Sequence, residues 1–300
     1  MDKRLGNSKQ LCGYYRFEVS EGKGKGMDMA FLYNGAIALL VNLSRASDIH
    51  QCFVRGRNVS FLSKNGLTVD PRDFLRSFPG GMLYTCGLDS LGSREGFYPH
   101  GNVHNIPATV ESIEESESGV ILHTRIEATA LFGMNLVIHR EISLKKDELS
   151  FTVKDRLVNE GHLPASYCML YHCNFGYPLV DEGTRIEGEY VSSLPRTPFA
   201  EKEFDKRRVM EKPEDAMEET CYFDTLKDGK VSLVNDSLPL KATVESNLPY
   251  LVEWKSRASG DYVIGLEPTT SFLDDRFVYS TLDPQKEVIH QLKITFDERK

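Results

Sequence analysis

Residues 149–158 read LSFTVKDRLV, and from Leu149 onward the first six residues alternate between apolar and polar. A period of two is typical of a β-strand with one buried and one solvated face. Helical periodicity is scarce, and strand-like runs recur at Val120–His123, Met134–Ile142, Lys230–Val234, Tyr262–Glu267 and Val288–Phe296. Many short strands in an even rhythm predict an all-β protein, either a sandwich or a barrel.

Turn signals separate the predicted strands. The clearest are NEG at 159–161, KDG at 227–229 and SGD at 259–261. Without a repeat, a low-complexity linker or a nucleotide-type alternation of strands and helices, we predict a single domain over residues 1–300. The polar stretch 196–220 interrupts the strand pattern, and we interpret it as a long surface excursion or, alternatively, as a lid over a pocket.

The composition argues against some classes of function. The net charge is −8 without a basic stripe, so nucleic acid is not expected as a partner, because binding to phosphates needs a basic surface. The longest apolar stretch, 36–43, is too short to span a bilayer, so no membrane partner is expected. Six cysteines without a CxxC pair, after a polar N-terminal segment, predict free thiols in a reducing cytoplasm.

A histidine follows a buried-looking run in YCMLYHCNFGYP, residues 167–178. His172 stands between this apolar segment and a Gly-Tyr-Pro turn. A histidine in such a place is either a satisfied core residue, a metal ligand, or an acid or base at the mouth of a sugar pocket. Taken alone, the stretch leaves these alternatives open.

A second polar group lies in YPHGNVHNIPA, residues 98–108. In an extended segment His100, Asn102 and His104 point to the same side, which gives a row of donors and acceptors suited to a polyol. The alternatives are a structural loop or a metal site, but no third ligand lies at a zinc-like spacing. We therefore expect no metal at this position.

Glu267 ends an apolar strand in GDYVIGLEPTTSF, residues 260–272, and precedes a proline. If it is buried, desolvation raises its pKa and makes it a proton acceptor at neutral pH; otherwise it faces solvent. Trp254, the only tryptophan, provides either a stacking wall for a sugar or core packing. The glycine pair at 80–81 allows a sharp turn or a close approach of backbone to a ligand.

Several of these stretches form a recognisable series: FPGGMLYTCGL (78–88), PHGNVHNIPA (99–108), LYHCNFGYPLVDEG (170–183) and GLEPTT (265–270). In this order they resemble the aldose 1-epimerase (galactose mutarotase-like) superfamily, most closely a bacterial branch of largely unassigned function. GKGMD, SRASDI, EETCYF and VEWK extend the similarity over nearly the whole chain. The resemblance implies a large antiparallel β-sandwich, called a supersandwich, with few short helices and a cleft on one concave sheet.

The resemblance also implies a reaction, the interconversion of the α and β anomers of a free sugar. His100 matches the family's histidine in an HG motif, which contacts the sugar. His172 matches the general acid, and Glu267 matches the general base. We expect these two catalytic groups on opposite sides of the sugar ring, with no metal or redox cofactor. The other expected sugar-binding residues are Asn102, His104, Glu219, Trp254, Arg45 and Arg76.

The sequence departs from the family pattern at one arginine. The family's early substrate-binding arginine has no counterpart, because Thr85 or Cys86 stands in its place. Arg45 and Arg76 are the candidates to replace it. Glu219, in EETCYF, is the candidate for the role of the family's sugar-binding aspartate.

The sequence therefore predicts a carbohydrate isomerase of the mutarotase type that acts on a free monosaccharide or a derivative. Two alternatives stay open. One is a non-catalytic sugar-binding or sensing protein on the same scaffold. The other is a different epimerase or isomerase, in which His100, His104, His172 and Glu267 hold a metal. A homodimer that pairs through sheet edges is compatible with a sandwich of this size.

Overall fold

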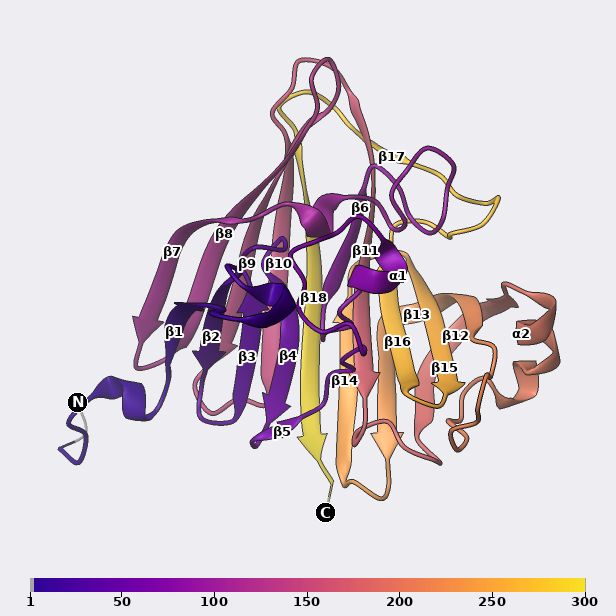
Figure 1. Ribbon diagram of the computed structural model, residues 1–300, viewed down its shortest axis with the longest axis horizontal. Helices are drawn as coiled ribbons and strands as arrows, with labels where there is room; N and C mark the ends of the chain where they lie inside the picture. Colours follow the sequence, from indigo (N-terminus) through magenta and orange to yellow (C-terminus); the bar gives the residue numbers. More distant parts are fainter. Residues whose placement is uncertain (1–2, 300) are drawn as a thin grey trace.

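The alternating run near residue 150 forms a strand, as predicted: β10 is Ser150–Asn159, with Phe151 and Val153 buried. The computed structural model describes residues 3–299. They form a large antiparallel β-sandwich of two sheets, as Figure 1 shows. The α-helices in this part of the chain are short, namely α1 (Phe74–Ser77) and α2 (Pro198–Lys202). None of the described helices is long and apolar enough to cross a bilayer.

The smaller sheet has five strands whose order in space follows their order in sequence. It lies in front of β7–β10 in Figure 1. Its strands are β1 (Gly13–Glu18), β2 (Asp28–Tyr33), β3 (Ile37–Asn42), β4 (Asp48–Val54) and β5 (Arg57–Asn58).

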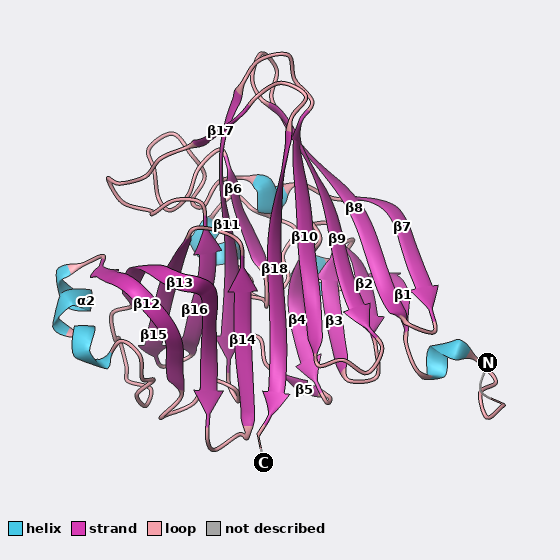
Figure 2. Ribbon diagram, turned by 180° about the vertical axis from the view of Figure 1, so that it is seen from behind, coloured by secondary structure: helices cyan, strands magenta, loops and turns pink. Residues whose placement is uncertain are grey.

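The larger sheet has thirteen strands in the order β17-β11-β16-β15-β13-β14-β18-β10-β9-β8-β7, with β12 paired to β13 and β6 paired to β11. Figure 2 shows this sheet from behind. Its other strands are β6 (Tyr84–Leu88), β7 (Thr109–Ser116), β8 (Gly119–Thr129), β9 (Asn135–Lys145), β11 (Ala165–Gly176), β12 (Arg185–Pro195), β13 (Thr220–Asn235), β14 (Leu240–Ser246), β15 (Tyr250–Ala258), β16 (Asp261–Thr269), β17 (Ser280–Leu282) and β18 (Glu287–Glu298).

The central strand β11 is buried on both faces. Tyr171 and Phe175 point into the main apolar core between the sheets. Cys168 and Leu170 point the other way, into a second apolar cluster. A strand that is covered on both faces reads as a nearly continuous apolar run, which explains YCMLY in the sequence. His172 shares the face of Cys168 and Leu170, because side chains alternate along a strand.

The turn predicted at residues 227–229 is wrong. This segment lies inside β13, where the pairing with β12 shifts register between Gly188 and Tyr190. Gly229 has a φ of +69° there, and a Cβ would lie 2.4 Å from the Ser246 carbonyl oxygen. A glycine at positive φ is typical of a β-bulge as well as of a turn. The bulge stands between the part of β13 that pairs with β15 and the part that pairs with β14.

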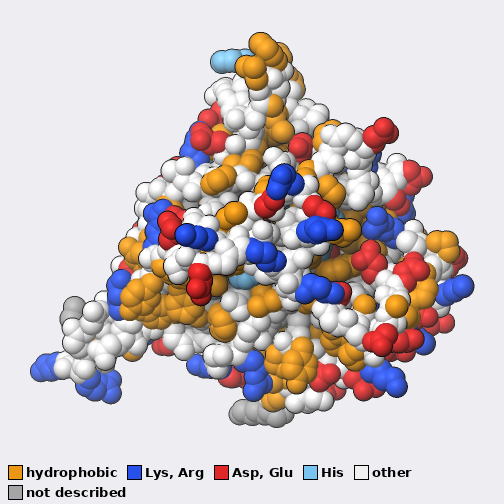
Figure 3. Space-filling view, in the orientation of Figure 1, with side chains coloured by type: hydrophobic (Ala, Val, Ile, Leu, Met, Phe, Trp, Pro, Cys, Tyr) orange, Lys and Arg blue, Asp and Glu red, His pale blue; other side chains and the backbone are white. Residues whose placement is uncertain are grey.

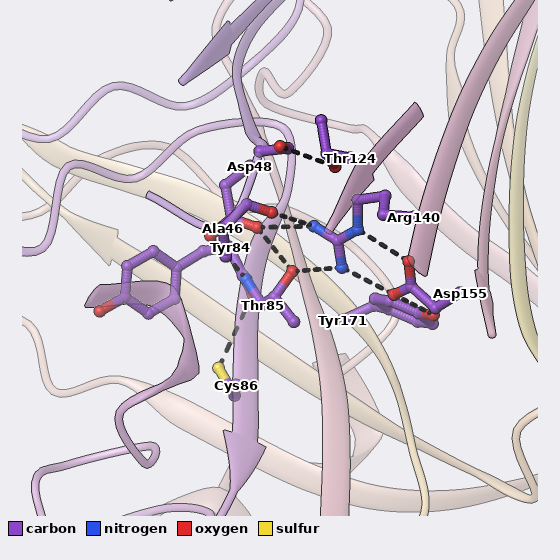
Figure 4. A network of polar contacts seen from close by, with 10 residues as sticks. Ala46, Asp48, Tyr84, Thr85, Cys86, Thr124, Arg140, Asp155 and Tyr171 are labelled. Carbon is purple, nitrogen blue, oxygen red and sulfur yellow. Dashed lines mark hydrogen bonds and ion pairs between the residues drawn. The ribbon is translucent and has the colours of Figure 1, made fainter. Parts of the chain in front are cut away.

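One buried cation joins the two sheets, as Figure 4 shows. Arg140 of β9 donates to both carboxylate oxygens of Asp155 on β10, at 2.8 and 2.7 Å. The same guanidinium lies 3.2 Å from Asp48 of β4 and 2.9 Å from the Thr85 hydroxyl of β6. Tyr171 of β11 donates to Asp155 at 2.8 Å. The arginine thereby connects the small sheet to the strands that carry the site described next.

Candidate functional site

A wide cleft opens on the face of the large sheet that carries His172. Its volume is about 1060 Å³. Side chains of β11, β16, β15 and β13 line it, together with residues 61–78 and the segment 92–100. Figure 1 shows α1 in front of the strands at this position. Of the residues predicted to act on a sugar, the lining includes His100, His172, Glu219, Trp254 and Glu267.

His172 and Glu267 meet inside this cleft. The register of β11 and β16 pairs Cys173 with Leu266, which sets His172 opposite Glu267 on the same face. The Nε2 atom of His172 lies 3.2 Å from Oε1 of Glu267. The two residues are only 5% and 1% exposed. The acid and base candidates therefore lie side by side, rather than on opposite sides of a space for a ring.

The surroundings of this pair favour neutral forms of both groups. Burial raises the pKa of Glu267 well above its ordinary value, Glu219 raises it further, and Arg196 opposes the shift. Burial lowers the pKa of His172 well below its ordinary value, and His100 adds to the effect. A carboxyl group that keeps its proton beside an imidazole that lacks one holds a single proton between them.

Gly265 makes the room that Glu267 needs. A Cβ at this position would lie 2.6 Å from Oε1 of Glu267 and 3.1 Å from Cε3 of Trp254. The register pairs Trp254 of β15 with Gly265 of β16, so the indole stands beside the carboxyl group. Trp254 donates from Nε1 to Oε2 of Glu219 at 2.8 Å. This hydrogen bond fixes the indole ring, whose centroid is 5.3 Å from that of His172.

His100 stands across from the pair. Its backbone has a φ of +63°, which is uncommon for a residue with a side chain and marks a constrained position. The imidazole centroid lies 5.6 Å from that of His172 and 5.4 Å from the ring of Phe74 on α1. Burial lowers the pKa of His100 to about 4, with Arg196 adding to the shift. Its Nδ1 is buried without a hydrogen-bond partner among the described residues, and the residue lines the cleft.

His104 and Asn102 do not join His100 in the cleft. Residues 103–105 form a turn of 3₁₀-helix, so the strand-like alternation predicted for this segment fails. His104 is 1% exposed and stacks on Tyr84 with ring centroids 4.2 Å apart. It lines a smaller cavity next to the cleft. Asn102 is exposed and its backbone N–H donates to Asp89 at 3.1 Å.

The two arginines predicted to replace the family's arginine also lie outside the cleft. Arg45 lines the smaller cavity and donates to the Thr68 carbonyl at 2.8 Å. Arg76 lies on α1 with 88% of its side chain exposed, 3.3 Å from Asp73. Neither side chain lies among the residues that line the cleft.

Thr85 and Cys86 stand on β6 at the position where the family has its substrate-binding arginine. Thr85 turns away from the cleft and bonds to Asp48 and Arg140 in the interior. Cys86 faces the other way and belongs to the apolar cluster beneath the cleft. Arg196, which follows β12, does line the cleft, as does Arg72. The sequence analysis missed Arg196 because it lies in the polar stretch 196–220.

The polar stretch 196–220 contacts the side of the sheet away from the cleft. Tyr222 donates to the Ala200 carbonyl at 3.0 Å, and Lys255 donates to the Lys206 carbonyl at 3.0 Å. Both side chains alternate with cleft-facing neighbours on their strands, so they point to the opposite face. Of this stretch, only residues near its two ends, Arg196 at the start and Met217 and Glu219 at the end, line the cleft.

A family model supplies the first comparison with known proteins. The domain of unknown function DUF4432 matches residues 24–285. The chain belongs to the DUF4432 family. No curated protein matches the sequence.

Solved structures resemble this DUF4432 protein closely in fold. A "putative aldose 1-epimerase" from Klebsiella pneumoniae has a TM-score of 0.86 at 19% identity, over 97% of this chain and 88% of that one. A galactose mutarotase-like protein from Clostridium acetobutylicum has a TM-score of 0.74 at 14% identity, over 96% and 99%. A "putative aldose 1-epimerase" from Escherichia coli K12 has a TM-score of 0.68 at 13% identity, over 91% and 100%. The predicted mutarotase-like β-sandwich is therefore confirmed as a fold.

The structure bears on the metal site that was one alternative for this DUF4432 protein. Within residues 3–299, no group of three or more His, Cys, Asp or Glu side chains is placed to hold a metal ion. His100 and His172 lie in the cleft, whereas His104 is stacked behind Tyr84. The histidines of the proposed metal set therefore do not converge on one point.

A pair of buried carboxylates, Asp224 and Glu253, lies on the face of β13 and β15 that points away from the cleft. Asp224 and Glu253 are 0% and 1% exposed, and the Tyr190 hydroxyl donates to Glu253. Burial raises the pKa of Glu253 well above its ordinary value, and Asp224 adds to the shift. The pair lies outside the cleft of this DUF4432 protein, so it affects stability rather than a ligand in the cleft.

Proposed function

We propose that this protein is a carbohydrate isomerase that interconverts the anomers of a free sugar. The observation that carries the proposal is the contact of 3.2 Å between His172 and Glu267 inside the cleft. Both groups are buried at the bottom of an open space that is large enough for a monosaccharide. The fold of the structural neighbours supports the same class of protein.

Opening of a cyclic hemiacetal requires two proton transfers. One proton leaves the hydroxyl group on the anomeric carbon, and another reaches the ring oxygen bonded to the same carbon. Because both oxygens are attached to one carbon, an adjacent base and acid can serve both. The reaction starts from the form of the pair in which the shared proton lies on His172, so that Glu267 accepts the hydroxyl proton and His172 donates its proton to the ring oxygen. Each such group typically contributes about 10²–10⁴-fold to the rate.

Closure of the ring uses the same two groups in reverse. After the ring opens, rotation about the C1–C2 bond presents the other face of the aldehyde. Glu267 then returns its proton to the new hydroxyl group, and His172 takes the proton back from the oxygen that closes the ring. The pair therefore ends with the single proton with which it began, so no outside acid or base is consumed.

The remaining predicted cleft residues would hold the sugar in place. The Trp254 indole offers an apolar face for the C–H side of a sugar ring, and Glu219 fixes its orientation through the bond to Nε1. His100 lines the cleft, and an imidazole can donate or accept a hydrogen bond with a hydroxyl group. Correct orientation of the ring over His172 and Glu267 lowers the entropic cost of both proton transfers.

The test is NMR measurement of anomer exchange at equilibrium with a panel of aldoses, ketoses and uronic acids. We expect wild type to accelerate exchange for at least one sugar, and Glu267→Gln and His172→Asn each to lower that rate by about 10²–10⁴-fold. Glu253→Gln is the matched control, because it makes the same change at a buried glutamate on the neighbouring strand, facing away from the cleft. It should retain activity.

Two outcomes would contradict the proposal. If no sugar exchanges faster with wild type than with Glu267→Gln, the protein is not a mutarotase for the panel. If a sugar quenches the fluorescence of Trp254 but does not exchange faster, the protein binds sugars without catalysis. The fluorescence result can be assigned to the cleft, because Trp254 is the only tryptophan of the sequence and it lines the cleft.

A further inference from the structure

Arg196 brings a positive charge into the cleft from the polar stretch 196–220, in which no site residue but Glu219 was predicted. It directly follows β12, and its backbone N–H donates to the Cys221 carbonyl at 3.0 Å. The register that pairs Pro195 with Tyr222 sets Arg196 beside Cys221, whose side chain faces the cleft. The Arg196 guanidinium lies against the Cys221 thiol and among the residues that line the cleft.

A row of side chains runs from Arg196 to the catalytic pair. Arg196, just after β12, stands beside Cys221 of β13, which is followed across the sheet by Trp254 of β15 and Gly265 of β16. Neighbouring strands are about 4.8 Å apart, so about 14 Å separate the backbones at the two ends of the row. Glu267 lies two residues beyond Gly265 on the same face. A ligand against Trp254 would therefore lie between the guanidinium and the His172–Glu267 pair.

The other cations in the cleft already have acidic partners. Lys64 lies 2.8 Å from Asp261, and Arg72 lies 2.6 Å from Asp70. Among the described residues, Arg196 alone of the three lining cations forms no salt bridge with a carboxylate. Basic side chains also lie around α1 on the face seen in Figure 3. An unpartnered guanidinium inside a cleft can bind a carboxylate or phosphate through two parallel hydrogen bonds.

We propose that Arg196 binds an anionic group of the substrate, a carboxylate or a phosphate, so that the protein acts on an acidic sugar with a free anomeric centre. The substrate class rests on the proposed function, whereas the anion site itself does not. The guanidinium would hold the acidic end of the sugar, and the anomeric carbon would lie over His172 and Glu267. Arg196 then supplies an arginine to the cleft from the end of β12, whereas Thr85 and Cys86, which stand in place of the family's arginine, lie on β6.

The first test compares acidic sugars with their neutral parents by NMR anomer exchange. The probes are D-galacturonate and D-glucose 6-phosphate against D-galactose and D-glucose. We expect kcat/KM for one acidic sugar to exceed that of its neutral parent by about 10-fold or more, and Arg196→Gln to reduce it about 10- to 100-fold. The neutral sugars should change less than about threefold. Comparison of D-galacturonate with D-glucose 6-phosphate shows whether the site prefers a carboxylate or a phosphate.

The second test measures binding without catalysis, through Trp254 fluorescence. Arg196→Gln should weaken binding of the preferred acidic sugar by a similar factor, and Arg196→Lys should restore part of it. Raised salt should weaken binding to wild type more than to Arg196→Gln. Arg185→Gln is the matched control, since it removes the same charge from the other end of β12, where Arg185 pairs with Asp236. It should leave both readouts unchanged.

The outcomes separate the two proposals. If neutral and acidic sugars exchange equally fast and Arg196→Gln slows both alike, the anion site is wrong and the proposed function stands. If no sugar exchanges but an acidic sugar binds in a manner that depends on Arg196, the anion site stands and the proposed function fails. If acidic sugars bind no more tightly than neutral ones, the anion site is overturned whatever the activity.

Discussion

Arg140→Met tests whether one buried cation holds the two sheets together. Methionine keeps most of the apolar volume and removes every donor that reaches Asp155, Asp48 and Thr85. Both carboxylates then lie in the interior without a cation. Removal of one partner from a buried ion pair costs about 3–5 kcal/mol. Unfolding entropy is about 2.1 cal/mol/K per residue, hence about 0.6 kcal/mol/K for 300 residues, so Tm should fall by about 5–8 °C.

The assay is thermal unfolding by circular dichroism at pH 5 and pH 8. Burial raises the pKa of Asp48 to about 6, although Arg140 opposes the shift, and loss of Arg140 raises it further. A carboxyl group whose folded pKa is raised contributes stability that is lost as the pH rises through that pKa. The deficit of Arg140→Met should therefore be larger at pH 8 than at pH 5.

Two comparisons make this prediction refutable. Arg156→Met removes an exposed arginine that lies 3.1 Å from Glu287, and it should cost less than about 1 kcal/mol. Adding Asp155→Asn to Arg140→Met should recover part of the loss, because it removes a buried charge. The reasoning fails if Arg140→Met costs no more than Arg156→Met, or if its deficit is the same at both pH values.

Three further predictions concern the cleft and its opposite face. The kcat/KM for anomer exchange should not change with pH around neutrality, because the His172–Glu267 pair keeps one proton between the lowered pKa of His172 and the raised pKa of Glu267. The kcat/KM should fall in acid, where the pair gains a second proton, and in alkali, where it loses its only one. A narrow peak in the pH profile would contradict this prediction. Gly265→Ala should reduce the rate of anomer exchange at least 10-fold while Tm falls by only a few degrees. The reason is that the Cβ of the alanine would meet the carboxyl group of Glu267 and the ring of Trp254. Unchanged activity would refute this placement of Glu267. Between pH 5 and pH 9, the Tm of Glu253→Gln should fall less than the Tm of wild type. A buried carboxyl group with a raised pKa destabilises the folded protein as it ionises, and glutamine cannot ionise. Parallel curves of Tm against pH would rule this out.

Local patterns in the sequence predicted several strands of the large sheet. The alternation in LSFTVKDRLV and in Val288–Phe296 corresponds to β10 and β18, which pair with each other in the large sheet. The KDG segment failed as a turn because Gly229 serves a β-bulge, and both structures favour a glycine at positive φ. The two cannot be told apart without knowledge of the neighbouring strand, which lies far away in the sequence.

The cleft depends on information that the sequence does not display directly. The motifs singled out His172 and Glu267, but only the register of β11 and β16 brings them to 3.2 Å. His104 leaves the cleft because one turn of 3₁₀-helix rotates it away from His100. Arg196 carries no motif, and its only signal was a position at the border between a predicted strand pattern and a polar stretch.

The pairing of β11 bears on how the chain reaches its native state. Its partners are distant in sequence: Cys168 pairs with Leu88, Cys173 with Leu266 and Ala165 with Leu282. Closure of such long loops makes folding slow, because non-local contacts form only after a large loss of chain entropy. During synthesis on the ribosome, the strand that bears His172 emerges long before β16 can join it. The newly made chain therefore has an apolar strand that can pair with β6 but not yet with β16, and the cleft is incomplete until the last part of the sheet arrives.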